Sequence, residues 1–522
     1  MHKLAAMESG STSLGGVSHA ATSPAGSAPG EKGLKRNAIG FVSSVVIGVA
    51  STAPGYSLAA VLGLVVAIEG VGVQAPAVMI ASFIPILFVA TAYRYLNRAD
   101  PDCGTTFSWA TRAFGPSTGW IGGWAIIVAD IIVMANLAQI AGLYTFLLVD
   151  VDDPSTAAVT ALGVVFIAAM TYICVIGIEL NAKTQRILLS AEILTLAAFA
   201  IVALIRVYAD APDASINPQL AWFSPFAIDS LDALVSGVLI GIFIYWGWDS
   251  LVTVNEETED SDEVPGKAAV TATVLLLGIY VVVSTAAIAF GGPERLAGDE
   301  SGDVLGLLAN DVFSSDLLGK LVVIAVLTSA AASTQTTILP TARTTLSMAR
   351  SRALPATFGK VHPRYLTPHV STIVMGALSI AWYVGLTIVS ENILFDSIAA
   401  LGLMIAFYYG ITAYACVWYF RKDIARGGKD LWVKGIFPLL GALILTFAFF
   451  KSAIDMLSGD YGYLGAWTVP GLGWEIGSVF ILGMGTILLG LPIMWILSRR
   501  EEQAPFFRGE TLHVDTPVKA PD

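Results

Sequence analysis

The sequence predicts an all-α polytopic membrane protein with twelve transmembrane helices, and three observations carry this prediction. Hydrophobic residues make up 55% of the 522 residues and charged residues only 13%, with a mean hydropathy of +0.73. Soluble domains of this length do not normally have such a composition. The apolar residues also form stretches of about 20 residues or more, the length that a helical span requires. Finally, Lys and Arg concentrate in every second loop between these stretches, as expected if each stretch crosses a membrane.

The expected spans are too long for the strands of a membrane barrel, so each of them is predicted to be a helix. In chain order they cover residues 38–66, 73–96, 118–148, 156–178, 187–208, 234–254, 267–290, 317–341, 370–389, 394–420, 432–452 and 475–498.

The distribution of basic residues predicts the orientation. If the N-terminus is cytoplasmic, all 28 Lys and Arg residues fall on the cytoplasmic side except Arg206, Arg295, Lys320 and Lys451. This positive-inside pattern predicts a multi-pass protein of the cytoplasmic membrane with both termini inside the cell. Residues 1–33 and 501–522 are low in hydrophobic content and are expected to be disordered tails around a domain at 34–500. The net charge of -12 gives no indication of a nucleic-acid partner.

Few residues in this chain suit catalysis or cofactor binding. Cys174 and Cys416 fall within expected spans and Cys103 on the cytoplasmic side, so no disulfide framework is supported. The five histidines lie in the tails and in one loop. No metal-ligand spacing and no phosphate-cradling loop is found, so neither a metal nor another cofactor is expected, and the protein is not expected to be an enzyme.

Two expected spans are interrupted by polar and helix-breaking residues, at 51–55 in the first span and at 245–250 in the sixth. Inside a bilayer, irregular backbone survives only where it is buried in protein or lines a wet cavity. A matched pair of breaks therefore points to the binding site of a transporter. It also predicts two five-helix repeats of inverted topology, about 36–210 and 230–422, followed by two more helices at 432–498. For Pro54 alone, a simple helix kink is an equal alternative.

Residues at and near the two breaks are the candidates for substrate binding. The half-helix that starts near Gly55 would offer amide groups and its positive dipole end to a carboxylate. Asp249 would pair with an ammonium group or cap a new half-helix, and a tryptophan beside it would stack on a cation or merely fill space. The predicted set is Ser51, Thr52, Ala53, Gly55, Asp130, Trp246, Gly247, Trp248 and Asp249.

Three further polar features have competing interpretations. Glu192, within the fifth span, would load and release a proton, or would be a permanently hydrogen-bonded structural residue. The hydroxyl-rich stretch at 328–337 would bind sodium or, more simply, allow close helix approach. The acidic run at 256–263 is expected to be a solvated face without chemistry.

Three segments together resemble the amino acid-polyamine-organocation superfamily of secondary transporters. They are Tyr245–Ala268, with an aromatic-Gly-aromatic break followed by a Glu-Glu pair; Arg343–Arg350, with the proline-containing loop up to Pro368; and Pro101–Trp120. The first break is similar to a proline-containing variant associated with amine and polyamine permeases, whereas Trp248-Asp249 resembles the L-type amino acid transporters.

This resemblance implies a LeuT-like fold and a permease that moves an amino acid or a small organic amine by alternating access, with a proton as the coupling ion in preference to sodium. A polyamine permease or an amino acid exchanger is the alternative. A channel or nutrient sensor built on a transporter scaffold is a further alternative from another class.

Overall fold

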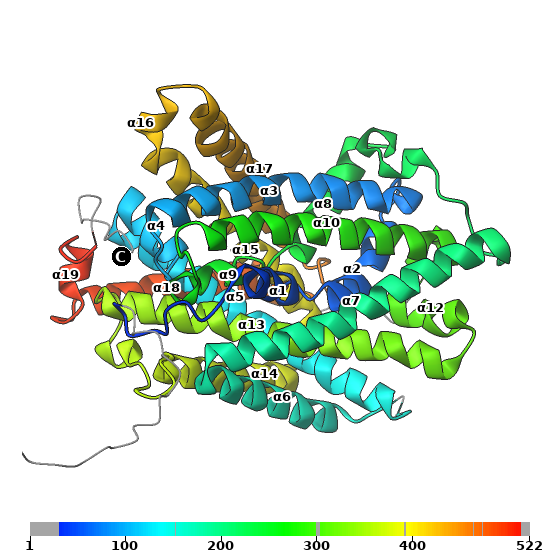
Figure 1. Ribbon diagram of the computed structural model, residues 1–522, viewed down its shortest axis with the longest axis horizontal. Coiled ribbons are helices and arrows are strands. Elements are labelled where there is room, and N and C mark those ends of the chain that lie inside the picture. Colours follow the sequence, from blue (N-terminus) through cyan, green and yellow to red (C-terminus); the bar gives the residue numbers. More distant parts are fainter. Residues whose placement is uncertain are drawn as a thin grey trace, which may run out of the picture.

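The computed structural model describes residues 31–151, 153–298, 303–390, 393–462, 464–471 and 473–512. These residues form an elongated bundle of helices (Figure 1). Eleven helical segments in this part of the chain are long and apolar enough to cross a membrane. The expected tail at 1–33 lies outside the described residues up to position 30.

The long helices follow the apolar stretches of the sequence closely. Those expected as spans are α1 (Phe41–Ser51) with α2 (Pro54–Val66), α3 (Ala75–Ala99), α5 (Pro116–Leu148), α6 (Thr156–Ile176), α7 (Ile178–Ala209), α8 (Leu231–Ile244) with α9 (Ser250–Thr253), α10 (Val264–Gly291), α13 (Asp316–Arg350), α14 (His369–Val389), α15 (Ile393–Tyr419), α17 (Phe437–Asp455) and α18 (Ser478–Ser498).

The expected span at 234–254 is not a continuous helix, because α8 ends at Ile244 and the chain turns before the four-residue α9 begins. For this reason eleven spans are counted in the described part of the chain. A twelfth span, formed by α8 and α9 together, stays a prediction. Two other helices extend furthest past the predicted limits. α7 starts at Ile178 instead of 187, and α13 continues to Arg350 instead of 341.

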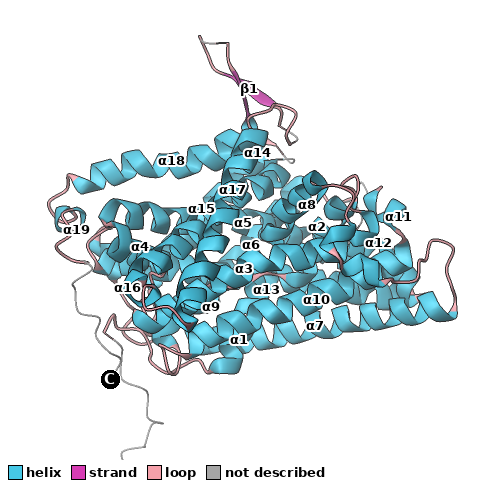
Figure 2. Cartoon of the chain, turned by 90° about the horizontal axis from the view of Figure 1, so that it is seen from above, coloured by secondary structure: helices cyan, strands magenta, loops and turns pink. Residues whose placement is uncertain are grey.

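Short elements connect the spans and cover the ends of the bundle. They are α4 (Thr106–Phe114), α11 (Pro293–Ala297), α12 (Val304–Phe313), α16 (Arg421–Ile424) and α19 (Ala504–Phe507), with strands β1 (Ala466–Thr468) and β2 (Glu475–Gly477). The two strands pair antiparallel and project from the bundle as a hairpin (Figure 2).

Part of the expected C-terminal tail is structured. Phe506 of α19 is fully buried, and its ring lies 5.5 Å from that of Phe107. Burial of one large aromatic side chain stabilises such a contact by roughly 1.5–3 kcal/mol.

Besides its apolar core, the bundle buries many polar side chains, while large apolar side chains are exposed on its surface. Leu194 of α7 and Phe447 of α17 are 71% and 54% exposed, whereas Glu192, Gln335 and Asp249 are buried. This distribution is expected where lipid is the solvent, because a polar group inside a membrane needs a protein partner. The buried polar residues therefore locate the functional interior.

Candidate functional site

The first break separates α1 from α2 at Thr52 and Ala53, midway along the bundle (Figure 1). Ala53 adopts left-handed backbone angles of φ 47° and ψ 62°, which cost a non-glycine residue free energy. Pro54 begins α2, where its missing amide hydrogen is harmless. The hydroxyl of Ser57 donates to the freed carbonyl of Thr52 over 2.8 Å. The irregular backbone is thus stabilised locally, as the membrane interior requires.

The second break, Tyr245–Asp249, lies directly against the first. Gly247 has a positive φ of 111°, and a Cβ atom at this position would lie only 2.7 Å from the carbonyl oxygen of Ser51. The hydroxyls of Ser51 and Ser250 are 2.8 Å apart, and Ser333 of α13 donates to the carbonyl of Ser51 over 2.8 Å. Two breaks far apart in sequence and one face of α13 therefore form a single polar junction.

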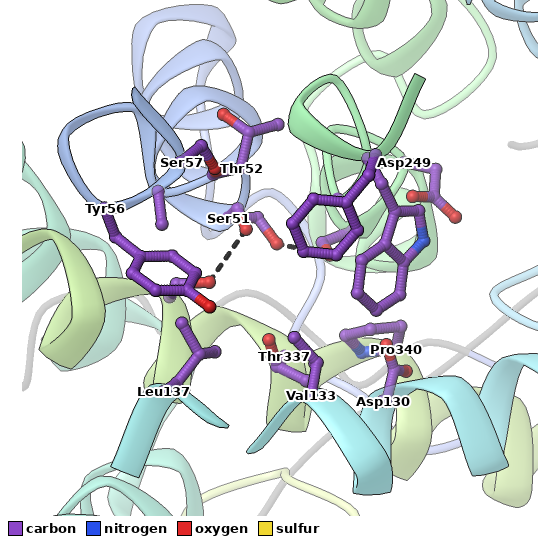
Figure 3. Close-up of a pocket in the computed structure, with 16 residues that line it drawn as sticks. Ser51, Thr52, Tyr56, Ser57, Asp130, Val133, Leu137, Asp249, Thr337 and Pro340 are labelled. Atoms are coloured by element: carbon purple, nitrogen blue, oxygen red, sulfur yellow. Dashed lines mark hydrogen bonds between the residues drawn. The ribbon is translucent and has the colours of Figure 1, made fainter. Parts of the chain in front are cut away.

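A small cavity lies at this junction (Figure 3). Its volume of about 20 Å³ accommodates about one water molecule, so a ligand requires the helices to move apart. Seven predicted residues line the cavity: Ser51, Thr52, Ala53, Asp130, Trp246, Gly247 and Asp249. The remaining lining residues are not in the predicted binding set, although Ser250 falls within the second predicted break and Ser333 and Thr337 within the hydroxyl-rich stretch at 328–337; they are Tyr56, Ser57, Val133, Leu137, Phe243, Ser250, Ser333, Thr337 and Pro340.

Asp249 is held by two tyrosines of α15. Tyr409 donates to its Oδ1 over 2.8 Å and Tyr408 to its Oδ2 over 3.1 Å. Trp246 in turn donates its indole N–H to the Tyr408 hydroxyl. These bonds fix the carboxylate at the cavity wall, and each oxygen keeps a lone pair for a further donor. The adjacent tyrosines within an apolar span were the available sequence signal for this support.

Asp130 of α5 faces the same cavity. It is 5% exposed, and its Oδ2 is buried without a hydrogen-bond partner among the described residues. In Figure 3, Asp130 and Asp249 lie on the same side of the cavity, opposite Tyr56 and Leu137. A buried carboxylate oxygen without a donor is costly.

Glu192 of α7 does not line the cavity but forms a hydrogen bond with the backbone at the first break. Its Oε1 accepts the amide hydrogen of Gly55 over 2.7 Å, and its Oε2 is buried without a partner in the described part of the chain. Ser329 of α13 lies next to it and accepts from the Tyr56 amide over 3.2 Å. The N-terminus of α2 therefore already carries a carboxyl group.

Two predicted binding residues lie outside the cavity lining. Gly55 directs its amide to Glu192. Trp248 is fully buried, with its ring packed 5.1 Å from Tyr93 and 5.5 Å from Tyr409. Neither residue is part of the cavity lining.

An ionic cluster ties the chain ahead of α1 to one end of the bundle. The Lys32 ammonium lies 2.7 Å from Asp102, 2.6 Å from Glu256 and 3.6 Å from the Cys103 sulfur. Burial alone would raise the pKa of the Asp102 carboxyl, but Lys32 and hydrogen bonds from Ser347 and other neighbours bring that pKa well below its usual range. The three ligand atoms of Asp102, Cys103 and Glu256 are close enough to hold a metal ion, yet the ammonium lies among them.

The expectation that residues 256–263 form a solvated face is wrong for two of them. Glu256 takes part in the Lys32 cluster. Glu257 is fully buried and forms two hydrogen bonds with Arg343 of α13, Nε to Oε2 at 2.6 Å and Nη2 to Oε1 at 3.0 Å. The chain reversal after α9 brings these acids under α13, which the spacing of charges alone does not reveal.

Two broken helices around a buried polar cavity, within a bundle of apolar spans, are the architecture of a secondary transporter. The chain belongs to the amino acid permease family, whose model matches residues 36–470. The protein is therefore a multi-pass membrane transporter.

Similar proteins carry different substrates. An uncharacterized transporter of Mycobacterium tuberculosis is 28% identical over 80% of this chain and 88% of its own length. The low-affinity putrescine importer PlaP of Escherichia coli is 23% identical over 69% and 77% of the two chains. The branched-chain amino acid permease BcaP of Bacillus subtilis is 22% identical over 91% and 95%.

Among solved structures, the crystal structure of MhsT in complex with L-phenylalanine superposes with a TM-score of 0.55. It shares 16% sequence identity, and the match covers 78% of this chain and 98% of the other. This similarity supports the predicted LeuT-like fold.

Proposed function

We propose that the protein moves an amino acid or a small organic amine across the cytoplasmic membrane by alternating access, with a proton as the coupling ion. The polar cavity between the two breaks carries this proposal. It holds about one water molecule in this structure, and Ser51, Gly247 and Ser333 from three separate elements meet at its wall. Relative movement of these elements would open the cavity to one side of the membrane at a time.

The coupling proposal rests on Glu192. This carboxyl group is buried at the first break with one oxygen on the Gly55 amide and the other without a partner among the described residues. Movement of α2 during transport would change its surroundings and hence its affinity for a proton. Binding and release of the proton would then depend on which side the cavity faces.

The hydroxyls of α13 favour the proton over sodium. Thr328 donates to backbone carbonyls of its own helix, Ser329 accepts from the Tyr56 amide and Ser333 donates to Ser51. These groups are engaged in helix contacts, and the carboxyl group of Glu192 lies beside them. The arrangement fits close helix approach better than a preformed sodium site.

A ligand screen on the purified protein tests this function. A ligand that binds only the folded state raises the apparent Tm by mass action. We expect at least one amino acid or polyamine to raise it, with a different magnitude at pH 5.5 and pH 7.5, and the same compound to enter proteoliposomes. A screen in which no amino acid or polyamine stabilises the protein or is taken up would contradict the proposal.

A further inference from the structure

Every backbone N–H group at the first break already donates a hydrogen bond within the protein. Pro54 contributes no amide hydrogen, and the remaining donors are bound as follows: Thr52 to Val49, Ala53 to Ala50, Gly55 to Glu192, Tyr56 to Ser329 and Ser57 to Ala53. A helix N-terminus attracts anions through free amide groups and its dipole. At the first break these amide groups already donate to acceptors within the protein, so they are not available to a substrate.

The group that fills this anion position is itself a carboxyl. Glu192 is fully buried and accepts from the Gly55 amide over 2.7 Å. A substrate carboxylate at the same place would lose this donor to Glu192 and would lie beside a second carboxyl group in a medium of low dielectric. The first break is therefore closed to an anionic group.

The cavity next to the first break favours a cation instead of an anion. Its lining contains two carboxylates, Asp130 and Asp249, and no Lys, Arg or His. Asp130 is nine-tenths buried with an oxygen that lacks a partner among the described residues, and the Asp249 oxygens can accept beyond their tyrosine bonds. A protonated amine supplies the N–H donors that such oxygens accept.

The second break offers no better position for an anion. No hydrogen bond within the described residues uses the amides of Gly247 and Trp248. These two amides directly precede Asp249, whose carboxylate forms the cavity wall. A substrate carboxylate bound there would meet a like charge within the same short turn.

On these grounds we infer that the substrate is an organic amine without a carboxylate, such as an alkylamine or a diamine, and that Glu192 excludes amino acids by filling the anion position of α2. This inference rests on the proposed transport function and narrows it. Asp130 and Asp249 bind the ammonium group, and Glu192 sets selectivity without contacting the ligand.

Matched pairs that differ by one carboxylate test the inference. Ornithine with putrescine, and phenylalanine with phenethylamine, are titrated against the full-length protein in detergent and offered to proteoliposomes. We expect each amine to bind at least about ten-fold more tightly than its amino acid, because the amino acid leaves a buried carboxylate without donors. Equal or tighter binding of the amino acids overturns the inference while transport stands. Failure of all four compounds, together with a negative ligand screen, overturns both.

Two variants separate a role in selectivity from a structural role. Asp130→Asn should weaken amine binding about ten-fold or more, whereas Asp316→Asn, an exposed acid at the start of α13, should leave it unchanged. Glu192→Ala frees the Gly55 amide and should narrow the affinity ratio between amine and amino acid. Equal losses for both members of a pair would show that Glu192 does not set selectivity. If Glu192→Ala does not fold, the inference is tested by Asp130→Asn alone. An amine affinity of this variant equal to that of the wild type overturns the inference.

Discussion

Replacement of Glu257 by Gln should destabilise the protein strongly, because Glu257 and Arg343 form an ion pair without solvent contact. The two side chains are 0% and 1% exposed and meet in a two-pronged geometry of 2.6 and 3.0 Å. In Glu257→Gln, one acceptor oxygen becomes an NH₂ donor that faces the guanidinium. The arginine charge then stays buried without a counter-charge.

The size of the effect follows from the burial of the pair. Removal of one partner from a buried ion pair costs about 3–5 kcal/mol, whereas replacement of both by apolar side chains is often neutral. The double variant Glu257→Gln, Arg343→Met should therefore recover much of the loss. An exposed Glu–Arg pair offers a matched control, since Arg508 and Glu510 are 59% and 52% exposed. Glu510→Gln should leave the stability nearly unchanged, because an exposed ion pair contributes little.

Thermal unfolding of the purified variants in one detergent measures this series. We expect the apparent Tm to fall by several degrees for Glu257→Gln, to return toward the wild-type value in the double variant, and to stay unchanged for Glu510→Gln. Equal Tm values for Glu257→Gln and Glu510→Gln would refute the reasoning, since the buried pair would then contribute no more than an exposed one.

Three further predictions address the breaks and the ionic cluster. Gly247→Leu should abolish uptake while membrane insertion persists, because its Cβ would lie 2.7 Å from the Ser51 carbonyl; transport at the wild-type rate would remove this break from the site. Glu192→Gln should flatten the pH dependence of uptake, and an unchanged profile at normal rates would exclude its coupling role. The Asp102 carboxyl has a pKa below its unfolded value of about 3.9, so its stabilising contribution is present above that value and is lost as the pH falls below it. Asp102→Asn should remove this acid-dependent part of the Tm curve between pH 7 and pH 3, and a curve parallel to that of the wild type would contradict the assignment.

The positions of the breaks could be predicted because their causes are local. Pro54 and Gly247 alter the backbone at their own positions, and the apolar stretches on either side define the spans. The same local logic predicted Asp130 and Asp249 as buried carboxylates, since a charge within a span must face the protein interior. The inverted relation of the two halves stays a prediction.

The partners of these residues could not be predicted, because they come from distant parts of the chain. Glu192 lies 137 positions from Gly55, and Tyr409 lies 160 positions from Asp249. The run of acids predicts that Glu257 is solvated, because its arginine partner is 86 positions away in the sequence. Only the packing of α7, α13 and α15 around the breaks brings such pairs together, and hydropathy and helix-breaking residues carry no information on that packing.

The central claim is that the cavity between the two breaks holds the transported ligand, and substrate protection of a cysteine placed there tests it most directly. Thr337 lines the cavity, so a small thiol reagent should reach Thr337→Cys when the cavity opens during transport. The three native cysteines are buried and lie outside the cavity lining, so the wild type serves as the background. We predict that the compound found in the ligand screen slows this labelling at the concentrations that support uptake. Labelling that proceeds at the same rate while uptake is saturated would contradict the account.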